Sequence, residues 1–298
     1  MLNWLKKIFT KLKGTKPIVG DIGLVNVKPE FNTDIKGELK FADKQENKFV
    51  EVNNTQQNQT FYLGMSYTEV KNVVDTELAL SNQRLMEILK PRLLPENIDK
   101  IKNDFDFLDT YREAVKISAK KQDDITDKVL SEIILERVKE ENDFPKIVQN
   151  ESIYTIGKLT KSQINILHTL AMCHSAALSY TDYDDLIIAL NELVKPLFDC
   201  NFVNIDFNYL VYTGCIDQLH TGYYEFNRII ERMAGNKYNL DSYKNSEDYK
   251  YMEQKWNNSL LNKSNLTTVG QYIGLHYHNV MFDKKLPNLN KLFIREDK

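Results

Sequence analysis

The spacing of apolar residues predicts a long helix that starts soon after residue 64. Ser66 followed by Glu69 has the pattern of a capping box, in which each side chain satisfies a free backbone amide at a helix start. Pro91 and Pro95 close the helix, because proline cannot continue its hydrogen bonding. The apolar stripe between these limits consists of Val70, Val73, Val74, Leu78, Leu85 and Leu89.

Similar patterns predict helices through the rest of the chain. Thr160 and Gln163 form a second capping box. Pro145 lies just past the end of the helix that we expect to begin at Asp124. No internal repeat is visible, which argues against a regular solenoid. The expected helices cover residues 104–120, 124–141, 160–172 and 182–198, with others near 205–212, 221–234, 246–262 and 267–281.

The segment from residue 18 to about 63 has the pattern of half-buried strands instead. Apolar and polar residues alternate in residues 18–27 and 37–41, and the alternation continues through residues 47–64. Strands this short and polar would be unstable alone. The sequence therefore predicts a mainly α protein, with a helical body preceded by a short β-rich and polar N-terminal segment (α+β overall).

A tract of consecutive Asn, Gln and Thr residues lies within the β-rich segment. Side-chain amides can form ladders when identical strands of neighbouring chains stack, so the tract is a candidate for self-association into a homo-oligomer. A plain flexible linker explains the same composition, and the sequence leaves both interpretations open. The candidate oligomerisation residues are Asn53, Asn54, Thr55, Gln56, Gln57, Asn58, Gln59 and Thr60.

The first 16 residues have a basic amphipathic pattern. They carry +5, and because the whole chain carries −3, the remaining residues carry −8. At 100° per residue, apolar and aromatic side chains occupy one arc and lysines the other. Such a helix suits a membrane interface, where lysines meet anionic headgroups. The candidate membrane-binding residues are Leu2, Trp4, Leu5, Lys6, Lys7, Ile8, Phe9, Lys11, Leu12 and Lys13.

The same helix could instead dock on the protein's own body or on a second subunit, with its lysines merely solvated. The sequence does not decide between lipid and protein. Gly14 and Pro17 end the helix and separate it from the β-rich segment. We thus divide the chain into residues 1–16, the β-rich residues 17–63, and two helical subdomains over residues 64–150 and 151–298.

Composition and charge exclude several function classes. The acidic remainder of the chain is a poor partner for a phosphate backbone, so nucleic-acid binding is disfavoured. No apolar run is long enough to span a bilayer. The opening stretch has charges among its apolar residues and no small-residue cleavage site, so its pattern is not that of a secretory signal. Neither phosphate-binding glycine motif occurs. Gly270 and Gly274 form a G-x-x-x-G pattern, which in a polar helix indicates close helix packing.

The residues that usually carry chemistry form no recognisable site. Cys173, Cys200 and Cys215 have no metal or redox spacing, and their odd number fits a reducing cytoplasm. His168 and His174 lie six residues apart and point in different directions from one helix. Three groups of aspartates, around Asp104, Asp123 and Asp182, sit at expected helix starts, where carboxylates cap free amides. We therefore assign no catalytic, cofactor-binding or metal-ligating residue.

Several stretches, in order along nearly the whole chain, resemble one bacterial family known only by locus-tag labels. They are GMSYTEVKNVV (residues 64–74), the stretch from DFDFLDTYREA to ERVKEEN (residues 104–142), LTKSQINILHTLAM (residues 159–172), YLVYTGC (residues 209–215) and LTTVGQYIGLHY (residues 266–277). No activity is assigned to that family. Its membership among accessory and mobile bacterial genes implies a conflict or phage-defence setting.

Three functions are consistent with these features. The first is a non-enzymatic assembly, sensor or scaffold protein, cytoplasmic or peripheral on the inner face of the membrane, which recognises an unknown protein partner. The second is a membrane-disrupting effector that uses the N-terminal amphipathic helix. The third is an enzyme with an unrecognised site, for which Cys215, His168 and His276 are the residual candidates. The first is our leading hypothesis.

Overall fold

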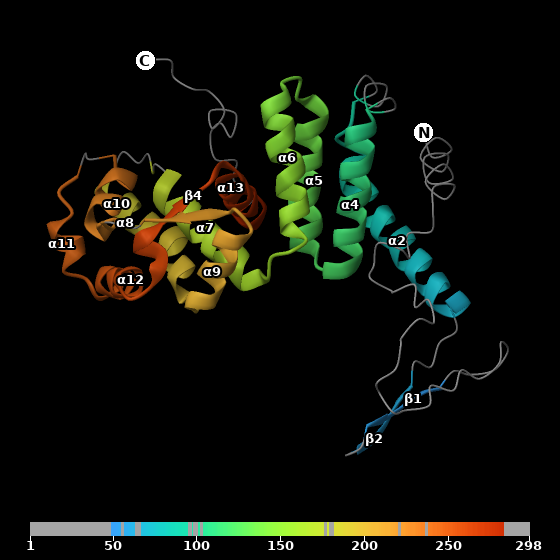
Figure 1. Cartoon of the computed structure of the whole chain (residues 1–298). Coiled ribbons are helices and arrows are strands. Elements are labelled where there is room, and N and C mark those ends of the chain that lie inside the picture. The colour runs from blue at the N-terminus through green and yellow to red at the C-terminus, as the bar shows by residue number, and fades with distance from the viewer. Residues whose placement is uncertain are drawn as a thin grey trace. The chain divides into compact units, whose positions relative to one another are not determined.

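Helices make up most of the described chain, which confirms the predicted mainly α class with a short β-rich segment before the body (Figure 1). The computed structural model describes residues 49–54, 57–62, 67–94, 97, 101, 104–175, 178, 182–219, 222–235 and 238–282. The chain divides into two units between residues 77 and 78, within the long helix α2 (Tyr67–Leu89). We describe each unit by itself.

The first unit contains an antiparallel hairpin. Strand β1 (Phe49–Asn54) pairs with β2 (Gln57–Tyr62), and the register places Asn53 opposite Asn58. These strands lie where the sequence alternates between residues 47 and 64. The expected strands at residues 18–27 and 37–41 lie outside the described residues.

Helix α2 occupies the region in which the sequence predicts a helix between Ser66 and Pro91. Its last turns pack into the second unit, where Leu85 and Leu89 are almost fully buried. The earlier part of the predicted stripe is different, because Val73 is 49% exposed. Within the second unit, the predicted stripe of α2 is therefore part of the core at Leu85 and Leu89.

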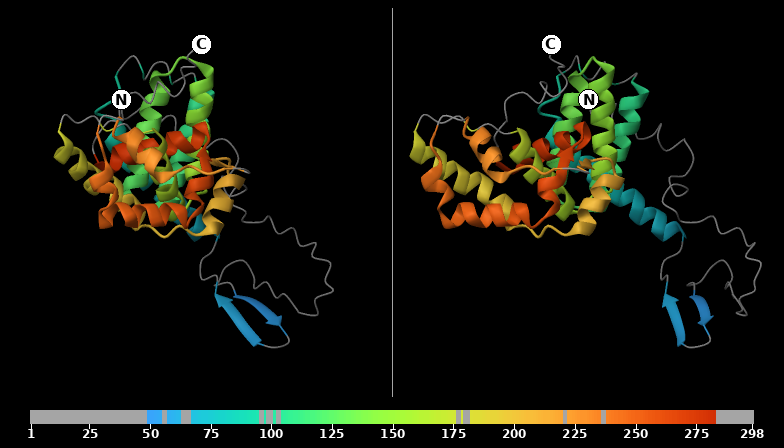
Figure 2. Two further views of the ribbon diagram at one scale, coloured as in Figure 1. Left: turned by 90° about the vertical axis from the view of Figure 1, so that its left-hand side faces the viewer. Right: turned by 60° about the vertical axis from the view of Figure 1, so that its left-hand side comes forward.

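Three antiparallel helices form the first part of the second unit. They are α4 (Phe105–Lys121), α5 (Asp124–Lys139) and α6 (Asp143–Ile156), and Figure 2 shows them side by side from a further direction. The predicted inward residues of α5, such as Val129 and Ile133, are buried. On α4, Phe107 and Tyr111 are buried as expected, whereas Leu108 is partly exposed.

Helix α6 corrects one expectation. The helix predicted from Asp124 ends at Lys139 rather than at residue 141. Pro145 lies past that end, as expected, but it belongs to the first turn of a further helix, α6. Proline is tolerated in a first helical turn because the backbone amides there have no partner within the helix. The predicted subdomain boundary between residues 150 and 151 falls inside α6, and the existence of two separate helical subdomains stays a prediction.

Helices α7 (Lys161–Ser175) and α13 (Thr268–Phe282) pack against each other at the centre of the second unit. A Cβ atom at Gly274 would lie 2.4 Å from the carbonyl oxygen of Leu167 on α7, and one at Gly270 would lie 2.0 Å from that of Cys215. Any side chain at these positions would collide with the facing backbone. The predicted role of the G-x-x-x-G pattern in close packing is thus confirmed.

Short elements complete the second unit. The helix expected over residues 182–198 is present, but it passes through a π-helical turn and a 3₁₀ turn, and Pro196 lies in the latter. The helix expected to reach residue 262 ends at Asn257 and is followed by a second small sheet. The elements are α8 (Tyr183–Ala189), η2 (Leu190–Val194), η3 (Lys195–Asp199), α9 (Asn204–Tyr212), β3 (Ile216–Gln218), α10 (Phe226–Met233), α11 (Asp241–Lys244), α12 (Glu247–Asn257), η4 (Leu260–Lys263) and β4 (Ser264–Leu266).

An aromatic cluster forms the core of this C-terminal part. The ring of Trp256 lies 6.0 Å from that of Phe226 and 6.5 Å from that of Phe198, and its indole nitrogen donates to the carbonyl of Tyr224 at 2.7 Å. Tyr249, which packs on Phe226, and Tyr243 are buried beside this cluster, so core packing explains part of the tyrosine-rich composition. Other tyrosines are on the surface, since Tyr212 is 82% exposed.

Candidate functional site

The β hairpin holds most of the predicted oligomerisation tract. Asn53 and Asn54 end β1, and the residues from Gln57 to Thr60 begin β2. Thr55 and Gln56, between the strands, lie outside the described residues. The register pairs Asn54 with Gln57 and Val52 with Gln59, so the tract folds back on itself within one chain. Pairing between chains is not tested by this arrangement and stays a prediction.

Each strand of the hairpin has one strand neighbour among the described residues. The backbone amides and carbonyls on the outer edge of such a strand alternate with those that face its partner, and they can pair with a further strand. A two-stranded hairpin is also marginally stable in water by itself.

The predicted membrane-binding residues, from Leu2 to Lys13, lie outside the described residues. No helix in the described part of the chain is both long and apolar enough to cross a bilayer. Attachment of residues 1–16 to a membrane surface stays a prediction.

Two buried histidines form a pair that the sequence does not indicate. Nε2 of His168 on α7 lies 3.0 Å from Nδ1 of His278 on α13, so one ring nitrogen donates and the other accepts. Burial, assisted by the neighbouring His278 ring, lowers the pKa of His168 to about 3. The pair joins two helices across a separation of 110 residues, and both side chains are buried.

The His276 side chain lies on a different side of α13 from that of His278 and contacts α5. Its Nε2 lies 3.3 Å from Oε2 of Glu136 on α5, and the same carboxylate oxygen accepts a hydrogen bond of 2.6 Å from the hydroxyl of Tyr272. Burial favours the neutral acid, but the His276 ring and the Tyr272 hydroxyl outweigh it and lower the pKa of Glu136. Two residues along a helix correspond to about 200°, which explains why His276 and His278 face different neighbours.

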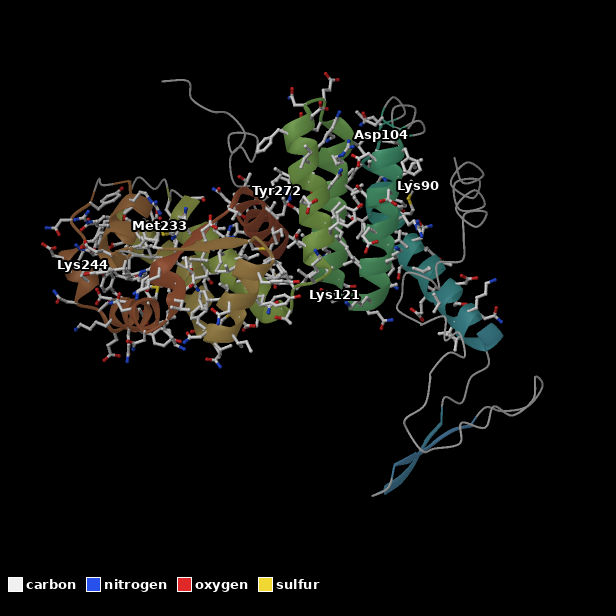
Figure 3. All side chains as sticks on the ribbon, viewed as in Figure 1. Lys90, Asp104, Lys121, Met233, Lys244 and Tyr272 are labelled. Carbon is white, nitrogen blue, oxygen red and sulfur yellow. The ribbon has the colours of Figure 1, made fainter. Side chains whose placement is uncertain are left out.

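Figure 3 shows the Tyr272 side chain where α13 faces α5 and α6. Burial, followed by the Glu136 carboxylate, raises the pKa of Tyr272 well above its usual value. Tyr272 is fully buried and remains a neutral hydrogen-bond donor. The Tyr272–Glu136 bond therefore connects α13 to the three-helix bundle rather than activating a nucleophile.

The remaining candidate nucleophiles are protonated or separate from one another. Burial raises the pKa of the Cys173 thiol to about 12, and it also raises that of Cys215. Cys215 contacts the hydroxyl of Thr213 at 3.5 Å, whereas His168 pairs with His278 and His276 with Glu136. The described structure thus does not bring Cys215, His168 and His276 together as one site. No cluster of metal-ligating side chains occurs among the residues described.

The acidic groups cap helices, as their positions in the sequence predict. The carboxylate of Asp104 accepts from the amide of Phe107, and that of Asp123 accepts from the amide of Thr126 at 2.8 Å. Asp182 accepts from the amide of Asp184 at 2.7 Å. These bonds satisfy amides at helix starts and leave no need for a metal to explain the carboxylates.

One charged cluster was not expected from the sequence. Arg137 of α5 is buried and donates to Asp106 of α4 at 2.8 Å and to Asn150 of α6 at 3.1 Å. Asn150 also donates to Asp106 at 2.7 Å. Partial burial opposes ionisation of Asp106, but these two donors lower its pKa. The cluster ties the three helices together, and only the crossing of the helices brings its members into contact.

Comparison with known proteins gives a family but no activity. A family model matches residues 68–247, which is more than half of the chain. Its description (“:-like”) names no function. No curated protein matches the chain, and no solved structure matches it. The matched region begins within α2 and reaches α12, so the hairpin and the basic N-terminal residues lie outside it.

Proposed function

Since the chain belongs to the uncharacterised family whose model matches residues 68–247, we propose a function from the chain's own residues. The protein is a non-enzymatic assembly or sensor protein. It self-associates through its N-terminal β segment, and its basic N-terminal helix attaches the assembly to the inner membrane surface. The helical body recognises a protein partner, in the phage-defence-like setting that the resemblance implies.

The observation that supports self-association is the geometry of the hairpin. Its strands contain Asn53, Asn54 and the residues from Gln57 to Thr60, and each has an outer edge without a strand neighbour in the part of the chain described. Edge pairing between copies would satisfy the backbone groups of that edge, and amide side chains of identical strands can form ladders. A stabilising third strand is what an isolated hairpin lacks.

Membrane attachment is supported by the separation of charge along the chain. The basic residues 1–16 contrast with a remainder of net charge −8, given the total of −3. A single short amphipathic helix binds lipid weakly, but several copies joined in one assembly bind much more firmly. The two N-terminal elements thus support each other, since association supplies the avidity that attachment needs.

Light scattering of two chains tests self-association. The full chain is expected to show a mass above that of the monomer, and a chain lacking residues 47–62 is expected to show a lower mass. A matched control lacks an equal number of residues between 18 and 41, which belong to the same β-rich segment but not to the hairpin. An unchanged mass on removal of residues 47–62 would exclude the hairpin as the self-association element.

Co-sedimentation with anionic liposomes tests attachment. The full chain is expected to sediment with the vesicles at low salt and to be released at high salt, and the chain without residues 1–16 is expected to stay in solution. If the truncated chain binds equally well, attachment through these residues is wrong. Leakage of a dye from the vesicles would favour a membrane-disrupting effector instead.

A further inference from the structure

Helices α4 and α6 of the second unit lie side by side and run in the same direction. Asn150 of α6 donates to Asp106 of α4 at 2.7 Å. About one turn further along both helices, Tyr154 donates to Asp109 at 3.0 Å. The outer face that the two helices share, the α4–α6 face, extends from Phe105 to Lys120 on α4 and from Ile147 to Lys158 on and just after α6.

Large apolar side chains are exposed at the end of this face where both helices begin. Phe105, in the first turn of α4, is 81% exposed, and Ile147, near the start of α6, is 58% exposed. Figure 3 labels Asp104, which caps α4, at this end. Exposed apolar groups gathered at one place are typical of a surface that binds a partner.

A hollow lies at the other end of the face. It has a volume of about 430 Å³, and Ile117 of α4 and Gly157, just after α6, form part of its lining. The carbon chains of lysines add to this apolar wall, which suits a large apolar side chain. The lysines are Lys116, Lys120 and Lys158, and Glu113, Glu151 and Tyr154 also line the hollow.

The exposed apolar side chains and the hollow lie on the same side of the two helices. Phe105 and Lys116 are eleven residues apart, which corresponds to three turns and about 20°. Ile147 and Tyr154 are seven residues apart, which is two turns to within about 20°. One face thus carries an apolar projection at one end and a hollow about 16 Å further along α4.

The two ends of the face also differ in charge. At the end where the helices begin, Arg137 is the shared cation of Asp104 and Asp106, so this group of charges is negative overall. At the other end, Lys120 and Lys158 are exposed. The face is therefore acidic where it projects and basic where it is hollow.

We infer that the α4–α6 face binds the same face of a second copy of the chain, in an antiparallel arrangement about a two-fold axis. A two-fold contact joins identical surfaces, so each end of one face meets the opposite end of the other. Phe105 of each copy then enters the hollow beside Ile117 of the other copy. Asp106 of each copy approaches Lys120 of the other.

The middle of the face is compatible with this arrangement. Glu113 pairs with Lys116 within each chain at 3.1 Å, so these two charges cancel. Glu151 is exposed, and the antiparallel arrangement brings it toward Lys158 of the other copy. Opposite charges across a contact favour this orientation of the two copies over others.

The face is large enough for a specific contact. A helix of 17 residues, such as α4, is about 25 Å long, and two neighbouring helices are about 20 Å wide. The face thus offers roughly 500 Å² per copy, and the total of about 1,000 Å² reaches the lower limit for a specific interface. A lipid surface is a poor alternative, because its anionic headgroups repel the acidic end.

Alanine substitutions on two sides of the body test the apolar part of the contact. Sedimentation velocity of the full chain at several micromolar concentrations gives the dissociation constant of the assembly. Phe105→Ala is expected to raise this constant at least about tenfold, because a two-fold contact loses the side chain twice. Ile147→Ala should also raise it. Ile188→Ala, the matched control on α8, should leave it unchanged, since Ile188 is 52% exposed and lies outside the face.

Charge reversal tests the orientation of the two copies. Lys120→Glu places a carboxylate opposite the acidic end of the other copy, so the dissociation constant is expected to rise at least about tenfold, and more at low salt than at high salt. Lys128→Glu changes the net charge by the same amount on the exposed side of α5. It should leave the constant unchanged.

Thermal unfolding, measured below the dissociation constant, provides the control for folding. All five substitutions are at exposed residues, so the unfolding midpoint should be that of the native chain. Equal dissociation constants for Phe105→Ala, Lys120→Glu and the native chain would overturn the contact.

This contact lies on the body and does not depend on the hairpin, so a chain lacking residues 47–62 separates the two. That chain is expected to remain a dimer, and Phe105→Ala within it to give a monomer. If it is monomeric up to about 100 μM while the full chain associates, the α4–α6 contact is wrong and hairpin association stands. If it has the same number of copies as the full chain and Phe105→Ala dissociates both, the α4–α6 contact stands and the role of the hairpin is wrong. A full chain that is monomeric at every concentration overturns both.

Discussion

The hydroxyl of Tyr272 donates a hydrogen bond of 2.6 Å to the carboxylate of Glu136, a residue 136 positions earlier in the chain. This bond joins α13 to α5 across the centre of the second unit. His276, one turn further along α13, lies against the same carboxylate oxygen. The contact between the C-terminal helix and the three-helix bundle thus includes a charge-assisted polar cluster as well as apolar packing.

Substitution Tyr272→Phe tests the contribution of this bond. It removes the donor and leaves the partly buried carboxylate with fewer partners, so we expect the free energy of unfolding to fall by about 1–3 kcal/mol. Tyr277→Phe is the matched control, because Tyr277 is a buried tyrosine of the same helix whose hydroxyl has no hydrogen bond among the described residues. Denaturant unfolding measures both changes, and equal losses would contradict a specific role for the Tyr272 hydroxyl.

Substitution Gly274→Ala tests the close approach of α13 to α7. The added Cβ would lie 2.4 Å from the Leu167 carbonyl oxygen, so one of the two helices must move. We expect a loss of at least about 2 kcal/mol in the free energy of unfolding, or failure to fold. Met281→Ala on the exposed side of the same helix should change stability little. A fully stable Gly274→Ala variant would mean that the two helices are further apart than described.

Substitution Arg137→Met tests the cluster that joins α4, α5 and α6. It removes a buried donor and leaves Asp106 and Asn150 without their shared partner, so we expect a loss of about 2–3 kcal/mol. Arg228→Met provides the comparison, since Arg228 is 78% exposed and pairs with Glu225. That exposed pair should contribute less than about 0.5 kcal/mol. Similar losses for the two variants, measured by thermal or denaturant unfolding, would contradict the argument.

The His168–His278 pair predicts a dependence of stability on pH. The pKa of His168 is lowered from 6.5 to about 3 in the folded protein, so between these values the unfolded chain binds a proton that the folded chain does not. Stability therefore falls as the pH falls below 6.5, and the contribution of this group between pH 7 and pH 5 is about 2 kcal/mol. Substitution His168→Gln should reduce the difference in unfolding free energy between these two pH values by this amount. The same difference in the native chain and the variant would show that His168 is not the group responsible.

Local patterns were sufficient to predict most elements of the fold. The capping box of Thr160 and Gln163 is present as expected from the sequence, with the amide of Thr160 donating to the Gln163 side chain at 2.8 Å. The aspartates before α4, α5 and α8 cap those helices, and Gly270 and Gly274 allow the expected close packing. The sequence pattern does not indicate helix α6, because Pro145 suggests a helix end, although proline is permitted in a first turn.

Periodicity, caps and charge act over a few neighbouring residues, so the amino-acid sequence is enough to indicate where helices and strands lie and which side chains are apolar. The contacts between distant segments depend on how the helices cross. Three contacts arise in that way: the His168–His278 pair, the Tyr272–Glu136 bond and the Arg137 cluster. No spacing of residues in the sequence indicates them. The burial of α2 is not indicated by its sequence either, since Leu85 is fully buried and Val73 is 49% exposed although both belong to the same apolar stripe.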